Sequence, residues 1–176
     1  MAEVLEMCGC RNFTRLGPRD ADRYADHLLR LSDKDRRLRF FGDAEDFLIE
    51  LHAGAAASDK RIVAICEEDG VIRAAAELLA DPTRPEVGEL AFTVEEGCQR
   101  KGMGSALMKE VIDAGVQAGF RKLELEILPD NESLLALARR FFERIEARDG
   151  RLFASIDLAH VTSRPASGQS LGQDRP

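Results

Sequence analysis

The sequence lacks the features that mark membrane proteins, secreted proteins and general nucleic-acid-binding proteins. No apolar run approaches the ~18 residues that a membrane-spanning helix needs. The first ten residues, MAEVLEMCGC, contain neither the basic nor the apolar segment of a secretory signal peptide. Basic residues number 25 against 32 acidic ones, which gives a formal net charge of -7. We therefore expect a cytoplasmic protein without membrane or nucleic-acid partners.

The chain is also poor in metal-binding and aromatic side chains. Its four cysteines stand at positions 8, 10, 66 and 98, and its three histidines at positions 27, 52 and 160. These spacings match neither a disulfide framework nor a common zinc pattern. We expect reduced thiols and no metal site. Tryptophan is absent and Tyr24 is the single tyrosine, so few aromatic side chains are available for catalysis.

What remains is the composition of an ordinary globular domain. The 176 residues are 44% hydrophobic and 32% charged, and this length is enough for one domain with a proper core. Residues 161–176, VTSRPASGQSLGQDRP, contain only two large aliphatic side chains and cannot offset the entropy cost of ordering. The sequence predicts a domain over 12–160 and a disordered tail over 161–176.

Periodicity predicts a short strand and three helices in the first third of the chain. The strand covers 13–16, and a helix starts after Pro18. SDKD at 32–35 matches the serine and acid positions of a capping box and starts the second helix. The third helix is expected over 44–53, with Gly54 after it.

Strands and helices then alternate. RIVAIC, the turn EEDG and VIRAAAELL are typical of a hairpin, and GELAFTVE at 88–95 is the next strand. An amphipathic helix over 104–118 and the alternating strand KLELEI at 122–127 follow. A last helix carries apolar residues as far as Ile145, and GRLFASIDL is the final strand. This order predicts a mixed α/β (α+β) sheet flanked by helices.

The segment CQRKGMGSALM, residues 98–108, has the residues of an anion site. It follows a strand and leads into a helix, whose first N–H groups lack intrahelical partners. Gly102 and Gly104 allow a phosphate to approach the backbone, and Arg100 and Lys101 add positive charge. The implied ligand is a phosphate or pyrophosphate, and the alternative is a glycine-rich turn with surface cations.

Two common phosphate motifs do not fit this segment. A P-loop requires a lysine directly after its last glycine, and Ser105 follows Gly104. A dinucleotide-binding fingerprint requires a third glycine where Leu107 stands.

The segment does resemble a third pattern. QRKGMG is similar to the Q/R-x-x-G-x-G/A loop of the GNAT superfamily of N-acetyltransferases, in which backbone amides hold the pyrophosphate of acetyl-CoA. The preceding strand, the following helix, KLELEI and PDNESLLALARRFF occur in the family's order. LSDKDRRLRFFG is similar to a segment in GNAT domains related to bacterial protein-lysine acetyltransferases. The resemblance covers about 12–158.

The resemblance implies a fold and a set of cofactor contacts. It implies a single GNAT-like domain with a mostly antiparallel central sheet, split between the strands at 88–95 and 122–127. The acetyl-CoA-binding residues that it implies are Phe92, Val94, Gln99, Arg100, Lys101, Gly102, Met103, Gly104, Ser105 and Asn131. Phe92 and Val94 would act through backbone N–H groups that stabilise the oxyanion of the reaction.

Glu89 is the candidate catalytic base. An alkylammonium with a pKa near 10.4 is almost fully protonated at pH 7, so the acceptor must lose a proton before it attacks the thioester. Glu89 matches a glutamate that many GNAT members carry on this strand, and the alternative is an exposed strand residue. Many members also have a tyrosine acid seven residues after the asparagine, where this chain has Ala138. Ser133 is a possible substitute.

Two functions from different classes follow. The first is an acetyl-CoA-dependent N-acetyltransferase acting on a primary amine, either a protein lysine or a small amine. The second is a CoA-binding regulatory module with little turnover, which the missing tyrosine favours. The acidic residues of the first helices suit a cationic acceptor, but they are equally typical of a solvated face. The sequence leaves open the acceptor, the length of the acyl group and a homodimer.

Overall fold

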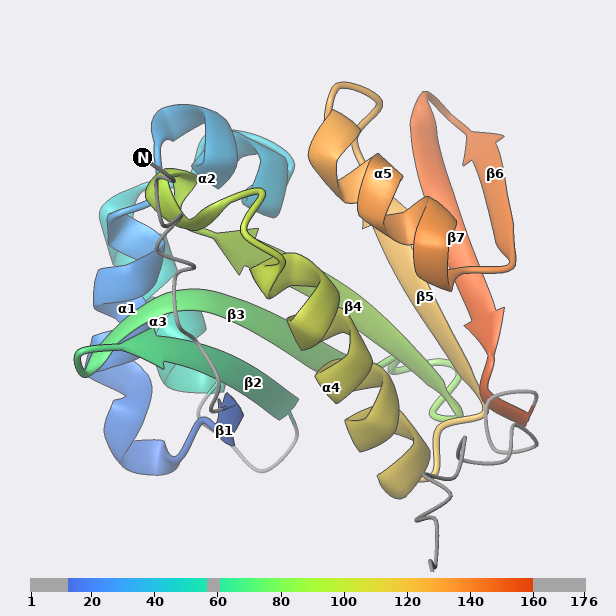
Figure 1. The fold of residues 1–176 in the computed structure, drawn as a ribbon, viewed down its shortest axis with the longest axis horizontal. Helices are drawn as coiled ribbons and strands as arrows, with labels where there is room; N and C mark the ends of the chain where they lie inside the picture. The colour runs from blue at the N-terminus through green and yellow to red at the C-terminus, as the bar shows by residue number, and fades with distance from the viewer. Residues whose placement is uncertain (1–12, 57–60, 160–176) are drawn as a thin grey trace, which may run out of the picture.

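The computed structural model describes residues 13–56 and 61–159, which contain a single seven-stranded sheet of order β1-β2-β3-β4-β5-β7-β6 (Figure 1). Neighbouring strands are antiparallel except for the parallel pair β4–β5. The strands are β1 (Phe13–Arg15), β2 (Arg61–Glu68), β3 (Val71–Ala80), β4 (Val87–Val94), β5 (Lys122–Ile127), β6 (Arg144–Arg148) and β7 (Arg151–Asp157). The expectation of a mixed, mostly antiparallel sheet is confirmed.

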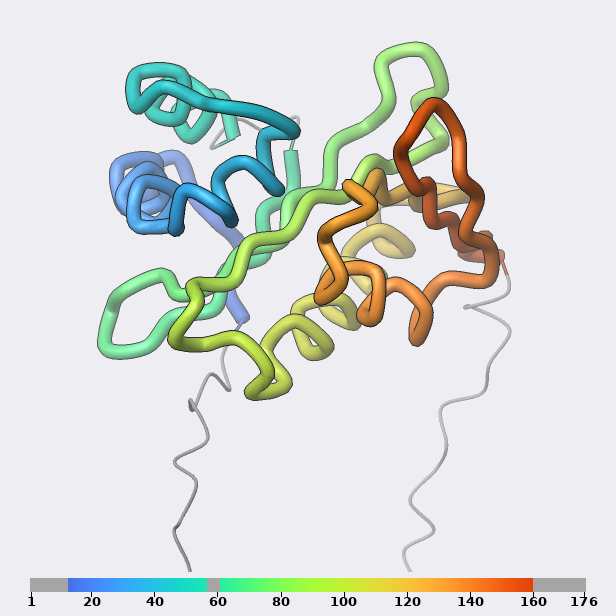
Figure 2. Tube along the Cα trace, turned by 90° about the horizontal axis from the view of Figure 1, so that it is seen from above, coloured from blue at the N-terminus to red at the C-terminus, as the bar shows by residue number. Residues whose placement is uncertain are grey.

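Helices lie on both faces of this sheet (Figure 2). They are α1 (Ala21–Leu29), α2 (Asp33–Phe40), α3 (Asp46–Ala56), α4 (Met103–Gln117) and α5 (Glu132–Phe141), with short 3-10 turns at Pro18–Asp20 and Glu96–Cys98. In this part of the chain, no helix combines the length and the apolar character that crossing a membrane requires. The predicted disordered tail lies outside the described residues.

Two separate apolar cores hold the helices to the sheet. On one face, α1 and α3 pack against β2 and β3, and this core includes Leu28, Ile49, Ile65 and Ile72. On the other face, α4 and α5 pack across β2 to β5 and β7, and this core includes Leu107, Val111, Leu123 and Leu125. The alternating side chains of the strands supply both cores, because successive residues point to opposite faces.

Local signals in the sequence set several element boundaries. The Ser32 hydroxyl accepts a hydrogen bond from the Asp35 N–H at 3.2 Å, which confirms the predicted cap at the start of α2. The β2–β3 turn places Asp69 and Gly70 at φ 52° and 75°, the positive values that a tight hairpin turn requires. The third helix begins at Asp46, two residues later than predicted.

The C-terminal hairpin corrects the sequence prediction. The last helix was expected to include Ile145, but α5 ends at Phe141 and the next residues form strand β6. Strand β6 pairs with β7 at the edge of the sheet, and Asp149 and Gly150 form the turn with φ 49° and 75°. Pairing with β7 outweighs the helical spacing of the apolar residues, an effect that local periodicity does not contain.

One cysteine also differs from expectation. Cys66 is disulfide-bonded, so the prediction of reduced thiols is wrong for this residue. Cys98 is a buried thiol that packs in the core beneath α4.

A charged group is buried beneath α1, α2 and α3. Glu77 of β3 is 5% exposed and accepts hydrogen bonds from Arg39 at 2.6 Å, from His52 at 2.8 Å and from the Tyr24 hydroxyl. Burial alone would raise the pKa of Glu77, but the Arg39 charge and the His52 hydrogen bond hold this pKa well below its usual range. The carboxylate therefore stays ionised and joins three helices to the sheet.

Replacing Glu77 by alanine is expected to destabilise the fold by about 3–5 kcal/mol, because Arg39 would remain buried without its counter-charge. Urea unfolding followed by circular dichroism measures this loss. Glu50→Ala is the matched control, since Glu50 is an exposed carboxylate on α3 and its loss should change stability by less than about 0.5 kcal/mol. Similar unfolding midpoints for the two variants would show that the buried pair is not stabilising.

Candidate functional site

A cavity of about 970 Å³ lies where α2, β4, the loop at 99–105 and α5 meet. The outer half of β4 forms one wall and the first turns of α5 form the other. Leu31 of the α1–α2 connection and Leu38 of α2 line it on the N-terminal side. The cavity thus joins the segment after β4 to helices that are distant in sequence.

The cavity exists because β4 and β5 diverge. Their parallel pairing runs only from Val87–Lys122 to Leu90–Leu125. Strand β4 continues to Val94 in pairing with β3 alone, and Figure 1 shows β5 bending away from it. The backbone edge of β4 that β5 would otherwise cover therefore faces the cavity.

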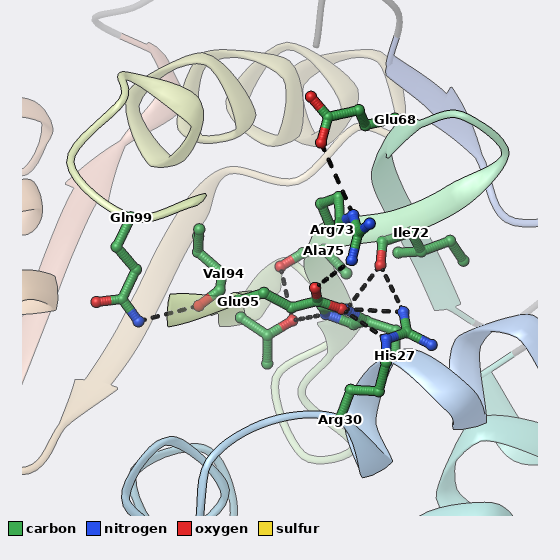
Figure 3. A network of polar contacts seen from close by, with 10 residues as sticks. His27, Arg30, Glu68, Ile72, Arg73, Ala75, Val94, Glu95 and Gln99 are labelled. Atoms are coloured by element: carbon green, nitrogen blue, oxygen red, sulfur yellow. Dashed lines mark hydrogen bonds and ion pairs between the residues drawn. The ribbon is translucent and has the colours of Figure 1, made fainter. Parts of the chain in front are cut away.

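Hydrogen-bond parity indicates which backbone groups lie on that edge. The Glu95 N–H donates to the Arg73 carbonyl at 2.9 Å. The backbone N–H and C=O groups of the odd-numbered residues of β4 therefore point toward β3. Phe92 and Val94 are even-numbered, so their backbone N–H and C=O groups point away from β3. In agreement, the Val94 carbonyl accepts from the Gln99 side chain at 3.0 Å, on the side away from β3 (Figure 3). The Phe92 and Val94 N–H groups thus face the cavity, where an oxyanion could accept from them.

The loop after β4 has the backbone form of an anion site. Arg100 and Gly102 both adopt left-handed conformations, with φ 60° and 87°. Gly102 is the N-cap of α4 and makes no side-chain cap, so the first N–H groups of a 15-residue helix are directed toward the cavity end of the loop. Successive N–H groups in such a turn form a concave site for a phosphate or pyrophosphate.

Two side chains, one from the N-cap residue of α5 and one from its last turn, complete this end of the cavity. Arg140 donates to the Ser105 hydroxyl at 2.8 Å and lines the cavity beside the loop. The Asn131 carboxamide oxygen accepts from the Leu134 N–H at 3.1 Å and caps α5, so its NH₂ group is the part that a ligand would contact. Sequence reasoning missed Arg140, although it lies in the PDNESLLALARRFF segment. The donors present fit a diphosphate group.

Most of the predicted cofactor-binding residues do line the cavity. They are Phe92, Val94, Gln99, Arg100, Gly102, Gly104, Ser105 and Asn131. Lys101 and Met103 are not among its lining residues; Lys101 is exposed and Met103 packs into the core at 5% exposure. The side chain of Gln99 bonds Val94 and, at 3.2 Å, Asp35, so it fastens the loop to β4 and α2.

The predicted base lies beside the cavity rather than in its wall. Glu89 is exposed on β4, opposite Glu124 of β5, in the last part of the paired region. Partial burial, followed by the nearby charge of Asp81, raises the pKa of Glu89. Hydrogen bonds lower the pKa values of Asp81 and Glu124, from Thr83 to the first and from Arg84 to the second. Glu89 is thus the carboxyl of this group best suited to take up a proton.

Tyr24 does not take the place of the tyrosine general acid that the sequence lacks at position 138. Ala138 is fully buried, and Tyr24 is 1% exposed on the opposite side of the sheet. Burial raises the pKa of the Tyr24 hydroxyl well above its usual value, and this hydroxyl donates to Glu77. Ser133, the other candidate, lines the cavity on α5.

Comparison with known proteins identifies the family and the fold. The model of the Acetyltransferase (GNAT) family matches residues 22–143. The GNAT domain of S. lividans PAT has a similar fold, with a TM-score of 0.74, 19% identity, and coverage of 82% of this chain and 89% of that one. A ribosomal-protein-alanine N-acetyltransferase from Brucella melitensis gives a TM-score of 0.67 at 15% identity, with coverages of 83% and 99%. The putative acetyltransferase yncA from Salmonella typhimurium, solved with its cofactor acetyl-CoA, gives 0.64 at 16% identity, with coverages of 92% and 98%.

Proposed function

Because this chain belongs to the GNAT acetyltransferase family, we propose that it transfers an acetyl group from acetyl-CoA to a primary amine, and that a protein lysine is its acceptor. The observation that carries the proposal is the divergence of β4 from β5 next to a glycine turn at the start of α4. One edge of β4 is thereby exposed beside backbone N–H groups that could bind a phosphate. A similar fold in a protein named as a ribosomal-protein-alanine N-acetyltransferase supports a protein as the acceptor.

Residues in and beside the cavity have separate roles in binding and catalysis. The N–H groups at the start of α4, with Arg100 and Arg140, would hold the diphosphate of CoA. The Phe92 and Val94 N–H groups would stabilise the negative charge that develops on the thioester oxygen during attack. Glu89 would take the proton of the acceptor amine, directly or through a water molecule, since it stands next to the cavity and not in its wall.

A CoA-binding regulatory module is the second candidate function. The observation in its favour is that a fully buried alanine, Ala138, stands where many family members have a tyrosine acid. This absence does not rule out the enzyme. A thiol ionises near pH 8.5, so the thiolate of CoA can leave and be protonated by water without that acid. Release of free CoA in the presence of peptides, polyamines, amino acids and aminoglycosides separates the two functions. The enzyme releases CoA only when an acceptor is present, whereas the module binds acetyl-CoA without turnover.

Acetyl-CoA is expected to raise the melting temperature of the protein. A ligand that binds only the native state adds about 2.7 kcal/mol at 100 times its dissociation constant. Differential scanning fluorimetry with millimolar acetyl-CoA measures this shift, and ATP, which also carries phosphates, is the control. A shift with ATP and none with acetyl-CoA would contradict the proposed cosubstrate.

A further inference from the structure

A buried histidine contacts the strand that carries the site from the face opposite to α4. His27 of α1 is 0% exposed, and its Nε2 lies 2.9 Å from the Thr93 hydroxyl oxygen of β4. Its Nδ1 lies 3.1 Å from the Ile72 carbonyl oxygen and 3.3 Å from a Glu95 carboxylate oxygen (Figure 3). The reaction proposed above uses neither His27 nor Thr93.

The partners of His27 determine the direction of these hydrogen bonds. A carbonyl and a carboxylate can only accept, so Nδ1 carries the proton that they share. In the neutral imidazole, Nε2 is then an acceptor for the one proton of the Thr93 hydroxyl. At 2.9 Å it is a closer acceptor than the Ala75 carbonyl oxygen, which lies 3.4 Å from that hydroxyl. Both lone pairs of the Thr93 oxygen remain for other partners.

Thr93 lies in the cavity wall, on the same face of β4 as Glu89. It lines the cavity, and residues 89, 91 and 93 share one face because strand side chains alternate. With its proton directed at His27, the Thr93 hydroxyl can only accept hydrogen bonds from a group in the cavity. An N–H of an amine or ammonium is such a group.

We propose that Thr93 binds an N–H of the acceptor amine, and that His27 is the positioning residue that fixes the Thr93 hydroxyl as a hydrogen-bond acceptor. This inference rests on the proposed acetyl transfer and adds to it the group that orients the acceptor. Glu95 supports the arrangement, because it keeps the His27 proton on Nδ1. Burial raises the pKa of Glu95, but hydrogen bonds from His27, Arg73 and Arg30 outweigh this and lower the pKa to about 2, so the carboxylate stays ionised.

Thr93→Val tests the inference, since it keeps the shape of the side chain and removes the hydroxyl. We expect kcat/KM for the acceptor amine to fall roughly 10- to 100-fold, the effect of one hydrogen bond to a charged group. The KM for acetyl-CoA should stay within about threefold. Thr93→Ser should restore most of the activity.

Tyr24→Phe is the matched control. It removes a buried hydroxyl from the same helix, α1, and from the neighbouring Glu77 network, which holds none of the proposed substrate contacts. It should lower the melting temperature, because it removes a hydrogen bond to the buried Glu77, and it should leave kcat/KM for the acceptor unchanged. A long-range ¹H–¹⁵N spectrum of the labelled protein at neutral pH should show His27 protonated at Nδ1.

The outcomes separate this inference from the proposed function. If the wild-type protein binds acetyl-CoA and acetylates no amine, the proposed function fails and the inference fails with it. If the wild type acetylates an amine and Thr93→Val does so with unchanged kcat/KM, the inference alone is overturned. A neutral His27 protonated at Nε2 would also overturn it, whatever the activity.

Discussion

Glu89→Gln is expected to lower turnover at pH 7 by at least ~100-fold, because general-base assistance contributes 10² to 10⁴ in rate. The change keeps the size and hydrogen-bonding shape of the side chain on β4 and removes its ability to take a proton. Acetyl-CoA affinity should change less than about threefold, since the loop and α5 line the cavity and Glu89 does not. At pH 9.5 part of the lost rate should return, because more of the amine is already neutral.

Glu124→Gln is the matched control for this experiment. Glu124 pairs with Glu89 across β4 and β5, so both residues receive the same substitution at neighbouring sites. Glu124 is already bonded by Arg84 at 2.9 Å and Lys122 at 2.6 Å, so its carboxylate is poorly suited to accept a proton. Initial rates at pH 7 and 9.5 for the wild type and both variants show whether Glu89 acts as the general base. Equal losses in the two variants would assign the effect to the charge of this surface, and no loss in either would exclude Glu89 as the base.

Gly104→Glu is expected to abolish acetyl-CoA binding while the protein still folds. A Cβ at Gly104 would lie 3.4 Å from Leu137, an ordinary contact, and the position begins a helix, so the backbone should tolerate a side chain. The carboxylate would occupy the helix start that must accept a diphosphate, and there it would repel it. Isothermal titration calorimetry should show at least a ~100-fold weaker dissociation constant, equivalent to about 2.7 kcal/mol.

Three further variants show whether charge and position cause this loss. Gly104→Gln adds similar bulk without charge and should weaken binding less. Gly97→Glu adds the same charge seven residues earlier, outside the cavity, where a new Cβ meets nothing within 4 Å, and it should bind acetyl-CoA normally. Arg100→Ala should cost less than Gly104→Glu, because backbone N–H groups make most of the contact. If Arg100→Ala were the more damaging change, side-chain charge would be the main determinant of binding.

The sequence allowed prediction of those parts of the site that depend on neighbours in the chain. The glycine turn at Gly102 and the start of α4 both follow from residue types at fixed short spacing, and the structure contains both of them. The strand KLELEI was predicted at its observed bounds for the same reason, since its alternation is complete within six residues.

Features that depend on distant segments were not predicted. Arg140 meets Ser105 across 35 residues, and neither spacing nor composition indicates that α5 passes over the loop. The contact between His27 and Thr93 spans 66 residues, and only the folded sheet brings α1 beneath β4. The edge strand β6 was missed because its partner β7 determines its conformation, and the Asp149–Gly150 turn was the one local signal for it.

The two cores on opposite faces of the sheet bear on how such a protein can diversify. The loop and α4, which would hold the cosubstrate, rest on the core that contains Leu107 and Leu123. Thr93 faces the helices of the other core, with Leu28 and Ile49. If Thr93 orients the acceptor as proposed, its surroundings belong to a different core from the residues that pack below the loop at 99–105. The proposed cosubstrate site and the proposed acceptor contact would then be free to evolve separately, because they rest on opposite faces of one sheet.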